Sequence, residues 1–573
     1  MKEKILEILK EETKGQNINE INNKLHLRGM EEITELEDNL KELVTEGVLH
    51  MSKNREYMLM SNTKSLKVGK LRINKNGNGF VECEPEDIFV HSNDLNGAIN
   101  GDFVEVEIKT RLNDPEPEGY IRNILKRDLK NVVGEMVKDK KTLAFKPDDE
   151  KLNIAVKLTK ESMKGCVEGH KVIISIIKEI GNRTFLGKVE KIIGHKNDPG
   201  VDILTIAAKH SIETEFSEEV KRELKNIPDE VCENDLIGRT DLTKEMIFTI
   251  DGDDTKDIDD AISVKRDGKN YVLGVHIADV SNYVKVGSAL YDSAFSRGTS
   301  SYLADTVIPM IPHQLSNGIC SLNPRVDRLT LSCDMEINSN GKVLNYDIYE
   351  SVINSKLRMT YKKANMILED GIIPEGYEEF IKELKDMAEL SKVLRKMKLQ
   401  RGEICFDVKE AKIIVDEECK PIEIGERERG TSEKMIEDFM IVANETVAEY
   451  ITNFGYPMMY RIHEAPREKK LKEFLDLLKA LGHKVKFKGK LKDIKPKQVQ
   501  EILDGLKDSP DYEMLSELGL RAMQKAIYST ENAGHFALAA KLYCHFTSPI
   551  RRFPDDTVHR VLKMILHGEE LTA

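Results

Sequence analysis

MIFTIDGDDTKDIDDAISV, residues 246–264, decides the fold of this chain: ten residues that contain six aspartates stand between two apolar segments. Runs of acidic residues are usually solvated loops. Here the apolar segments on both sides predict a buried strand that delivers the acids into a pocket. Carboxylates held about 4 Å apart repel by roughly 4 kcal/mol per pair at an effective dielectric of about 20, so several fixed together favour protonation or a bound cation.

The spacing of the acids narrows the choice of cation. An EF-hand calcium loop that began at Asp251 would need Gly at its sixth position and Glu at its twelfth, where this chain has Lys256 and Ile262. Mg²⁺ or Mn²⁺ that clamps a phosphodiester fits the pattern better, and a purely structural metal site is the alternative. The acids that would hold the ion are Asp251, Asp257, Asp259 and Asp260.

Length and composition indicate a multidomain protein outside the membrane. The 573 residues are 40% hydrophobic and 33% charged, and the cysteines include no CxxC pair that would suggest zinc. No run of about 18 apolar residues is present, and residues 1–14 are charged and helical, so we expect a cytoplasmic protein without a membrane segment. The net charge of −13 argues against whole-surface binding to nucleic acid, so any polyanion must meet local basic patches.

Residues 1–62 carry the periodicity of three helices, followed by two short strand-like pieces at 47–51 and 57–60. Asn17, with Glu20 three residues later, predicts a capping box at the start of the second helix. Three helices and a hairpin predict a winged helix. Such a module either reads nucleic acid or serves only in packing.

Two strand-rich units are predicted next, at residues 66–126 and 131–200. In the first, Phe80, Phe89 and His91 stand among basic and glycine-rich turns, where exposed aromatic rings on a small barrel would stack on single-stranded bases. Both phenylalanines fit a barrel core equally well. The sequence of this stretch is similar to that of a cold-shock domain, which favours RNA binding. For residues 131–200 we predict a second OB barrel.

Residues 236–573 are predicted to form a large α+β domain with the acidic run near its start. Within it, residues 297–324 form a long segment rich in Pro, Gly, Ser and Asn, and long ordered loops tend to be functional. Tyr302 in this segment can stack on a terminal base. A buried tyrosine with one hydrogen bond is the commoner case.

The sequence HFTSPIRRFPDDTVHR, residues 545–560, supplies cationic side chains. Ser548 and Pro549 suit the cap and first position of a helix, whose N-terminus can bind an anion. Arg551 and Arg552 would then stand where a phosphate arrives. Surface arginines in salt bridges are the alternative, but metal-aided phosphoryl transfer needs cationic groups at the developing charge.

Several phrases of the chain together resemble the ribonuclease II family of exoribonucleases, also called the RNB family, and within it the ribonuclease R branch. They form an ordered series across the α+β domain: TIDGDDTKDIDDA (249–261), HIADVSNYV (276–284), YLADTVIPMIP (302–312), LSNGICSLNP (315–324), MIEDFMIVANE (435–445) and HFTSPIRRFPDDTVHR (545–560). The N-terminal order of a helical module and two barrels resembles the family as well.

The resemblance implies a processive 3′ to 5′ exoribonuclease that releases nucleoside 5′-monophosphates from single-stranded RNA with a free 3′ end. It implies Mg²⁺, with Mn²⁺ as an alternative, and no organic cofactor. It assigns metal binding to the four acids named above, and Asp259 is the one we expect to be least replaceable. Tyr302 would clamp the terminal nucleotide, and Arg551 would stabilise the phosphate under attack.

The family continues past the segment that matches residue 573, with helices that carry a further active-site glutamate and with a third RNA-binding barrel. The resemblance therefore predicts an α+β domain that is incomplete at its C-terminus. A truncated, catalytically weak or silent RNA-binding protein is the alternative function, and a metal-dependent DNA nuclease is a third. We expect a monomer that associates with RNA-decay or ribosomal machinery.

Overall fold

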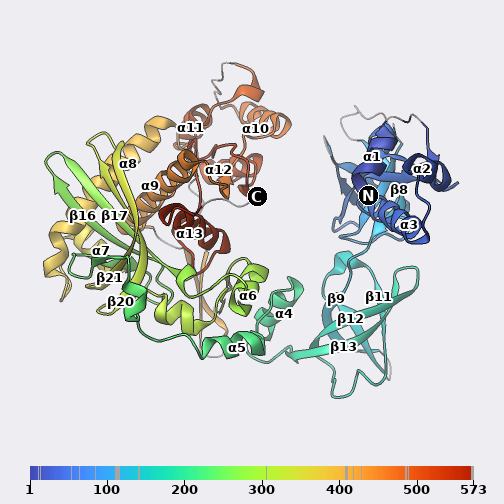
Figure 1. The fold of residues 1–573 in the computed structure, drawn as a ribbon, viewed down its shortest axis with the longest axis horizontal. Helices are drawn as coiled ribbons and strands as arrows, with labels where there is room; N and C mark the ends of the chain where they lie inside the picture. The colour runs from blue at the N-terminus through green and yellow to red at the C-terminus, as the bar shows by residue number, and fades with distance from the viewer. Residues whose placement is uncertain are drawn as a thin grey trace. The chain divides into compact units, whose positions relative to one another are not determined.

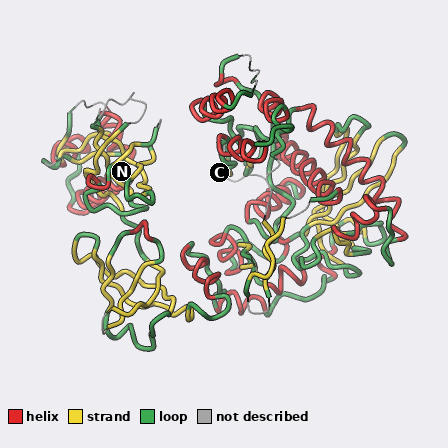
Figure 2. The backbone as a smooth tube through the Cα atoms, turned by 180° about the vertical axis from the view of Figure 1, so that it is seen from behind, coloured by secondary structure: helices red, strands yellow, loops and turns green. Residues whose placement is uncertain are grey.

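The computed structural model describes residues 1–569 except 11, 13, 53, 64, 84–85, 110–116, 140–141, 305, 407–410, 417–418, 427–428, 484, 486 and 488. The chain divides into two compact units, Met1–Ser211 and Ile212–Ala573 (Figure 1). Strands dominate the first unit beyond its N-terminal helices, whereas the second combines long helices with strands (Figure 2). No helix of the described residues is both long and apolar enough to cross a membrane.

The N-terminal part of the first unit contains the three predicted helices and the hairpin. The capping box at Asn17 is confirmed, because its side chain accepts the Glu20 N–H at 3.1 Å while the Glu20 carboxylate accepts the Asn17 N–H at 2.8 Å. Three short strands pair in the order β1-β3-β2. The winged-helix classification stays a prediction. The elements are α1 (Lys2–Lys10), β1 (Gln16–Asn17), α2 (Ile18–Leu25), α3 (Met30–Thr45), β2 (Leu49–Met51) and β3 (Glu56–Leu59).

Residues 66–126 form a closed five-stranded barrel in the order β4-β5-β6-β8-β7, as the sequence predicts. Alternate residues such as Leu71, Val81 and Val90 are buried inside it. Phe80 is 37% exposed and therefore lies outside this core. The strands are β4 (Leu66–Ile73), β5 (Gly79–Glu82), β6 (Ile88–Val90), β7 (Phe103–Ile108) and β8 (Glu118–Lys126).

The second strand-rich unit is a five-stranded sheet in the order β10-β9-β12-β13-β11. Its two outer strands also lie close to each other, so the sheet curls round on itself. Helix α4 (Val201–Lys209) packs on β9, β12 and β13, which carries this unit beyond the predicted end at residue 200. The strands are β9 (Asn131–Asp139), β10 (Thr142–Pro147), β11 (Ala155–Leu158), β12 (His170–Gly181) and β13 (Thr184–His195).

The central sheet of the second unit has the order β14-β21-β20-β17-β16. Its edge strand β16 begins at Asp260, so the acidic run leads directly into the sheet. The segment before the run, β15 (Thr249–Asp251), pairs in parallel with β22 (Arg358–Thr360). The sheet strands are β14 (Thr240–Leu242), β16 (Asp260–Asp267), β17 (Asn270–Ala278), β20 (Asp327–Ile337) and β21 (Val343–Asn354).

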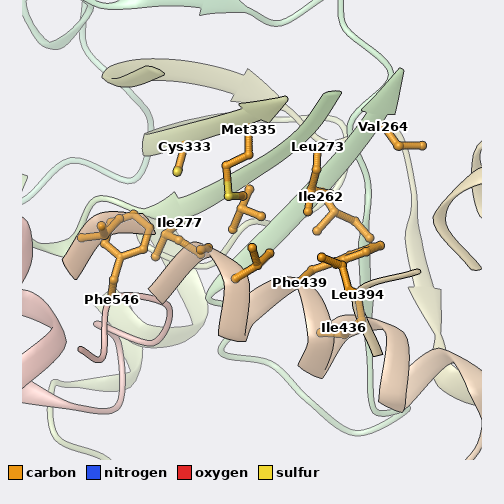
Figure 3. Packing of buried hydrophobic residues seen from close by; sticks show 14 of the residues in the cluster. Ile262, Val264, Leu273, Ile277, Cys333, Met335, Leu394, Ile436, Phe439 and Phe546 are labelled. Atoms are coloured by element: carbon orange, nitrogen blue, oxygen red, sulfur yellow. The ribbon is translucent and has the colours of Figure 1, made fainter. Parts of the chain in front are cut away.

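Two long helices, α8 (Ile381–Arg401) and α9 (Thr431–Phe454), cover one face of this sheet. Figure 3 shows Leu394 of α8 and Ile436 and Phe439 of α9 against Ile262 and Leu273 of the sheet. Burying one such side chain stabilises the fold by about 1.5–3 kcal/mol, so this layer fixes the sheet that carries the acids.

The other elements surround this layer. Helices α5 and α6 belong to a second core, while α10, α11 and α12 form a third. These elements are α5 (Glu218–Leu224), α6 (Ala289–Arg297), β18 (Ser301–Tyr302), β19 (Val307–Ile308), α7 (Tyr361–Asn365), β23 (Ala411–Val415), β24 (Pro421–Glu426), β25 (Tyr460–Ile462), α10 (Glu468–Ala480), α11 (Pro496–Asp504), α12 (Tyr512–Ala522), β26 (Ile527–Ser529) and α13 (Phe553–Leu566).

A buried charge cluster joins the end of β17 to α13. One oxygen of Asp279 lies 2.6 Å from Nη2 of Arg239 and 2.6 Å from Nζ of Lys563. Burial acts to raise the pKa of Asp279, but the charges of Lys563 and Arg239 outweigh it and hold this pKa well below its usual range. Because the pKa is lower in the folded protein, this carboxylate stabilises the fold above the pKa of an unfolded aspartate, about 3.9.

We expect Asp279→Asn to lower the free energy of unfolding at pH 7 by about 3 kcal/mol, because two buried cations lose the closer of their two shared counter-charges and keep only Glu350. As the pH falls below about 4 towards the folded pKa, the difference between the variants should shrink, since the wild-type carboxylate then takes up a proton. Denaturant unfolding at several pH values measures this. Glu517→Gln, which removes the exposed ion pair with Arg521 on α12, should change stability by less than about 1 kcal/mol.

Candidate active site

One large cavity of about 2030 Å³ in the second unit brings together the predicted site residues of the α+β domain. The acids reach it from the loop between β15 and β16. Phe80, Phe89 and His91 lie in the first unit, on or beside the barrel strands β5 and β6. The predicted residues that line the cavity are Asp251, Asp257, Asp259, Asp260, Tyr302, Arg551 and Arg552.

The middle of the acidic loop is held by residues that the sequence did not single out. Fully buried Ser321 donates its hydroxyl to the Lys256 carbonyl at 2.7 Å and accepts the Ile258 N–H at 3.1 Å. The Leu322 N–H donates to the Ile258 carbonyl at 3.0 Å. Ser321 belongs to the LSNGICSLNP phrase, so the only sequence signal for it is the unusual composition of that long segment.

Asp259 is the most constrained of the acids. It is 4% exposed, its Oδ1 accepts the Ile550 N–H at 2.8 Å, and its Oδ2 lies 3.5 Å from Nε of Arg551. Burial raises the pKa of Asp259 well above its usual range, although the charge of Arg551 and the Ile550 N–H act in the opposite direction. This carboxylate is therefore rigidly placed and ready to accept further positive charge.

The turn that carries Arg551 differs from the sequence prediction. The helix starts at Phe553 with Arg552 as its N-cap, so Ser548 and Pro549 do not open it, and the predicted helix N-terminus at the phosphate is wrong. The Ser548 N–H instead donates to Oδ1 of buried Asp555 at 2.8 Å, and Arg552 donates to the same oxygen at 2.7 Å. These bonds fold residues 548–552 into a turn, which leaves Pro554 in the first helical turn, where no N–H is needed.

The Tyr302 side chain lies outside the core and is held by one hydrogen bond. Its side chain is 52% exposed, and its hydroxyl donates to Oδ2 of Asp257 at 3.0 Å. Desolvation and the charge of Asp257 raise the pKa of Tyr302, so the phenol stays protonated and keeps donating. The ring is thereby anchored at one end while much of its surface remains accessible to a ligand.

The electrostatics of the cavity favour an added cation. Burial is the main cause of the raised pKa of Asp251, and burial together with the charge of Asp251 raises the pKa of Asp260 to about 7. A donor set made only of carboxylate oxygens suits a hard ion such as Mg²⁺. Among the residues that the structure describes, no three acidic, His or Cys side chains already converge as a metal cage. The ligand set therefore stays a prediction.

Asn444 on α9 ties the opposite wall of the cavity to the Arg551 segment. Its Oδ1 accepts the Phe546 N–H at 2.7 Å, and its Nδ2 lies 3.4 Å from the hydroxyl of Tyr543 and 3.5 Å from that of Thr547. The side chain is buried and lines the cavity. Asn444 lies in the MIEDFMIVANE phrase, where a polar residue inside an apolar helical run is the signal that reveals it.

Family models match most of the chain. The model of the RNB domain matches residues 239–568, that of the ribonuclease B OB domain residues 69–124, and that of a cold shock domain residues 145–217. The chain belongs to the RNB family of exoribonucleases. The cold-shock match lies on the second strand-rich unit, whereas the OB match lies on the closed barrel.

Individual relatives place this RNB enzyme in the ribonuclease R branch. It is 42% identical to ribonuclease R of Thermotoga maritima over 567 residues, which cover 98% of this chain and 79% of that one. The apo structure of Mycoplasma genitalium RNase R has a TM-score of 0.82 at 31% identity and covers 88% of this chain and 80% of that one. A complex of the same Mycoplasma protein with ribose-methylated single-stranded RNA gives the same values.

The predicted fold class and enzyme class are therefore confirmed. The RNB protein has OB-type strand units followed by an α+β catalytic domain, and it is a hydrolytic 3′ to 5′ exoribonuclease of a metal-dependent family. A catalytically silent RNA-binding protein is not favoured by these matches.

We expect Asp555→Asn to lower kcat by at least about tenfold, because the turn that presents Arg551 loses a charged anchor and a displacement of about 1 Å at a reacting group costs up to ~100-fold. Single-turnover RNA hydrolysis measures this. Asp556→Asn is the matched control, since Asp556 is also buried and contacts Arg560 at 2.7 Å, outside the cavity lining. An equal loss of kcat in both variants would contradict a positioning role for Asp555.

Proposed function

We propose that this enzyme degrades single-stranded RNA processively from a free 3′ end and releases nucleoside 5′-monophosphates, with Mg²⁺ as its metal and Mn²⁺ as a substitute. The presence of four acids, one anchored tyrosine and one arginine in the lining of a single cavity supports this proposal most directly. The Mycoplasma RNase R in complex with single-stranded RNA supports the choice of substrate.

All four acids would bind the metal ion, and one of them would also fix the geometry of the site. Asp251, Asp257, Asp259 and Asp260 would hold the metal, which supplies a polarised phosphate and a nucleophile of lowered pKa when it is bound. Asp259 would act as the fixed reference point of the set, because the Ile550 N–H and Arg551 already hold its carboxylate. Its replacement should therefore be the most damaging.

Arg551 and Tyr302 would bind the reacting end of the RNA. Burial acts to lower the pKa of Arg551, but Asp259 and the surrounding groups raise it overall, so the guanidinium stays charged. A fixed positive charge at the scissile phosphate stabilises the charge that develops during hydrolysis. The accessible ring of Tyr302 would stack on the terminal nucleotide, with its hydroxyl held by Asp257.

The barrel of the first unit would bind RNA upstream through an aromatic row. The rings of Phe80 and Phe89, cross-strand partners on β5 and β6, lie 5.3 Å apart, and His91 lies 4.8 Å from Phe89. Arg72 stands opposite Phe80 on β4 and pairs with Glu82. Arg552 would add a phosphate contact in the catalytic domain.

We further propose a cytoplasmic monomer that associates with RNA-decay or ribosomal machinery, as the family assignment suggests.

We expect the protein to shorten a 5′-labelled single-stranded RNA only when Mg²⁺ or Mn²⁺ is present, and to release mononucleotides. Asp259→Asn should lower the rate by roughly a thousandfold, because loss of one fixed electrostatic group costs about 10²–10³. Asp254→Asn is the matched control, since Asp254 is exposed in the same acidic run and has no assigned role.

Two results would contradict this proposal. An RNA-binding wild-type protein that released no mononucleotides would support the silent alternative. Equal hydrolysis of an all-deoxy strand would support the DNA-nuclease alternative, since a ribonuclease that reads the 2′-hydroxyl should discriminate against it.

Phe80→Ala should weaken binding of single-stranded RNA by about 1–3 kcal/mol, the usual value of one base-stacking side chain. Fluorescence anisotropy with a catalytically blocked Asp259→Asn background measures this. Phe454→Ala is the matched control, because Phe454 is an exposed phenylalanine on α9 that has no assigned role. A loss of barrel stability without weaker RNA binding would show that Phe80 serves in packing only.

A further inference from the structure

Arg358 is an arginine next to the acidic loop that pairs with none of its acids. It lies on β22, where it pairs with Thr249 of β15. Thr249 is two residues before Asp251 in the sequence. Its Nη2 donates to three main-chain carbonyls of the loop: Gly252 at 3.4 Å, Asp253 at 3.0 Å and Thr255 at 2.5 Å. Within the described part of the chain its Nε is buried and has no hydrogen-bond partner.

The three carbonyls belong to the turn that fixes Asp251. The Thr255 N–H donates to the Gly252 carbonyl at 3.3 Å, which closes the turn. Oδ1 of Asp251 accepts the Gly252 N–H at 2.7 Å and the Thr255 hydroxyl at 3.1 Å. Arg358 therefore binds the outer, carbonyl side of the same turn whose inner side orients the Asp251 carboxylate.

This arrangement adds positive charge without occupying a carboxylate. A cation paired with Asp251 or Asp260 would compete with a metal for the same oxygens. Carbonyl oxygens accept the guanidinium N–H groups instead, which leaves the carboxylate oxygens of the acids free. All three hydrogen bonds come from Nη2 alone. A lysine Nζ also carries several N–H donors, but it stands one atom closer to the main chain than Nη2 does, so we expect it to reach only part of this set of carbonyls.

We propose that Arg358 is a positioning residue for the metal site: it sets the distance between Asp251 and the acids at 257–260 and so raises the affinity of the site for divalent cations. The inference rests on the proposed metal-binding role of these acids. Residues that orient metal ligands from behind typically change metal affinity by about 10–100-fold when they are replaced.

The test compares direct binding of Mn²⁺ by RNA-free protein, followed by the electron paramagnetic resonance signal of free Mn²⁺, with Mg²⁺-dependent RNA hydrolysis. Arg358→Met should raise the Kd for Mn²⁺ by about tenfold and raise the Mg²⁺ concentration for half-maximal rate by a similar factor. The KM for RNA at saturating Mg²⁺ should stay within about twofold, because Arg358 has no assigned contact with substrate. Arg358→Lys should recover only part of the Mn²⁺ affinity.

Arg297→Met is the matched control. The Arg297 guanidinium also donates to main-chain carbonyls, those of Glu213, Glu215 and Pro309, and its buried Nε likewise lacks a partner within the described residues. Both methionine variants should lower the Tm, but only Arg358→Met should lower Mn²⁺ affinity.

Three outcomes separate the possibilities. If Arg358→Met binds Mn²⁺ with wild-type affinity and only its Tm is lowered, the inference is overturned and the proposed function remains intact. Full recovery in Arg358→Lys would show that any cationic nitrogen near the turn is sufficient and would overturn the specific positioning by Nη2. A wild-type protein that binds no Mn²⁺ and hydrolyses RNA without metal would overturn the proposed function itself.

Discussion

The burial of carboxylates close to one another in one cavity is the constraint on which the rest of the catalytic domain depends. Desolvation and neighbouring negative charge raise the pKa values of Asp251, Asp259 and Asp260, so the loop that carries them is costly to form. The fold holds that loop from all sides, through Ser321, the Ile550 N–H and Arg551. These contacts come from two parts of the sequence that are distant from the acidic loop, around Ser321 and at Ile550 and Arg551, and together they fix the loop.

The surrounding layers supply the rigidity that this loop needs. The sheet that begins at Asp260 is packed against α8 and α9, and the same end of the sheet is joined to α13 by the buried cluster at Asp279. Because α13 follows directly after the Arg551 turn, the same helix fixes both the sheet and the cationic side of the cavity. Stability and site geometry are thus linked through a few buried polar contacts, whose loss leaves charges unpaired in the interior.

In the proposed function, the first unit contributes base stacking and the second contributes hydrolysis. The barrel of the first unit presents aromatic rings on its outside, where base stacking tolerates any sequence. The cavity of the second unit combines a half-exposed ring with acids and arginines. With a net charge of −13, such local sites rather than the overall charge must provide affinity for RNA.

The sequence by itself determined the elements and the chemistry. Alternating and helical periodicities, the Asn17 capping box and the acidic run between apolar strands are local signals, so the barrel and the α+β domain could be predicted. The structure places Asp259, Tyr302 and Arg551 in one cavity, and their roles stay predictions. The sequence motifs that resemble the family added an expected role for each of these residues.

Only the tertiary structure decided how the acids are held. Ser321, Asn444, Asp555 and Arg358 act through contacts with residues that are distant in sequence or through main-chain groups, which leave no local pattern. The start of α13 at Phe553 was mispredicted for the same reason: Ser548 is a good helix cap in isolation, but its N–H and that of Ile550 are claimed by Asp555 and Asp259. Hydrogen bonds to two buried carboxylates, one seven residues from Ser548 and the other 291 residues from Ile550, override the local capping preference. The longer-range bond exists only once the chain has folded.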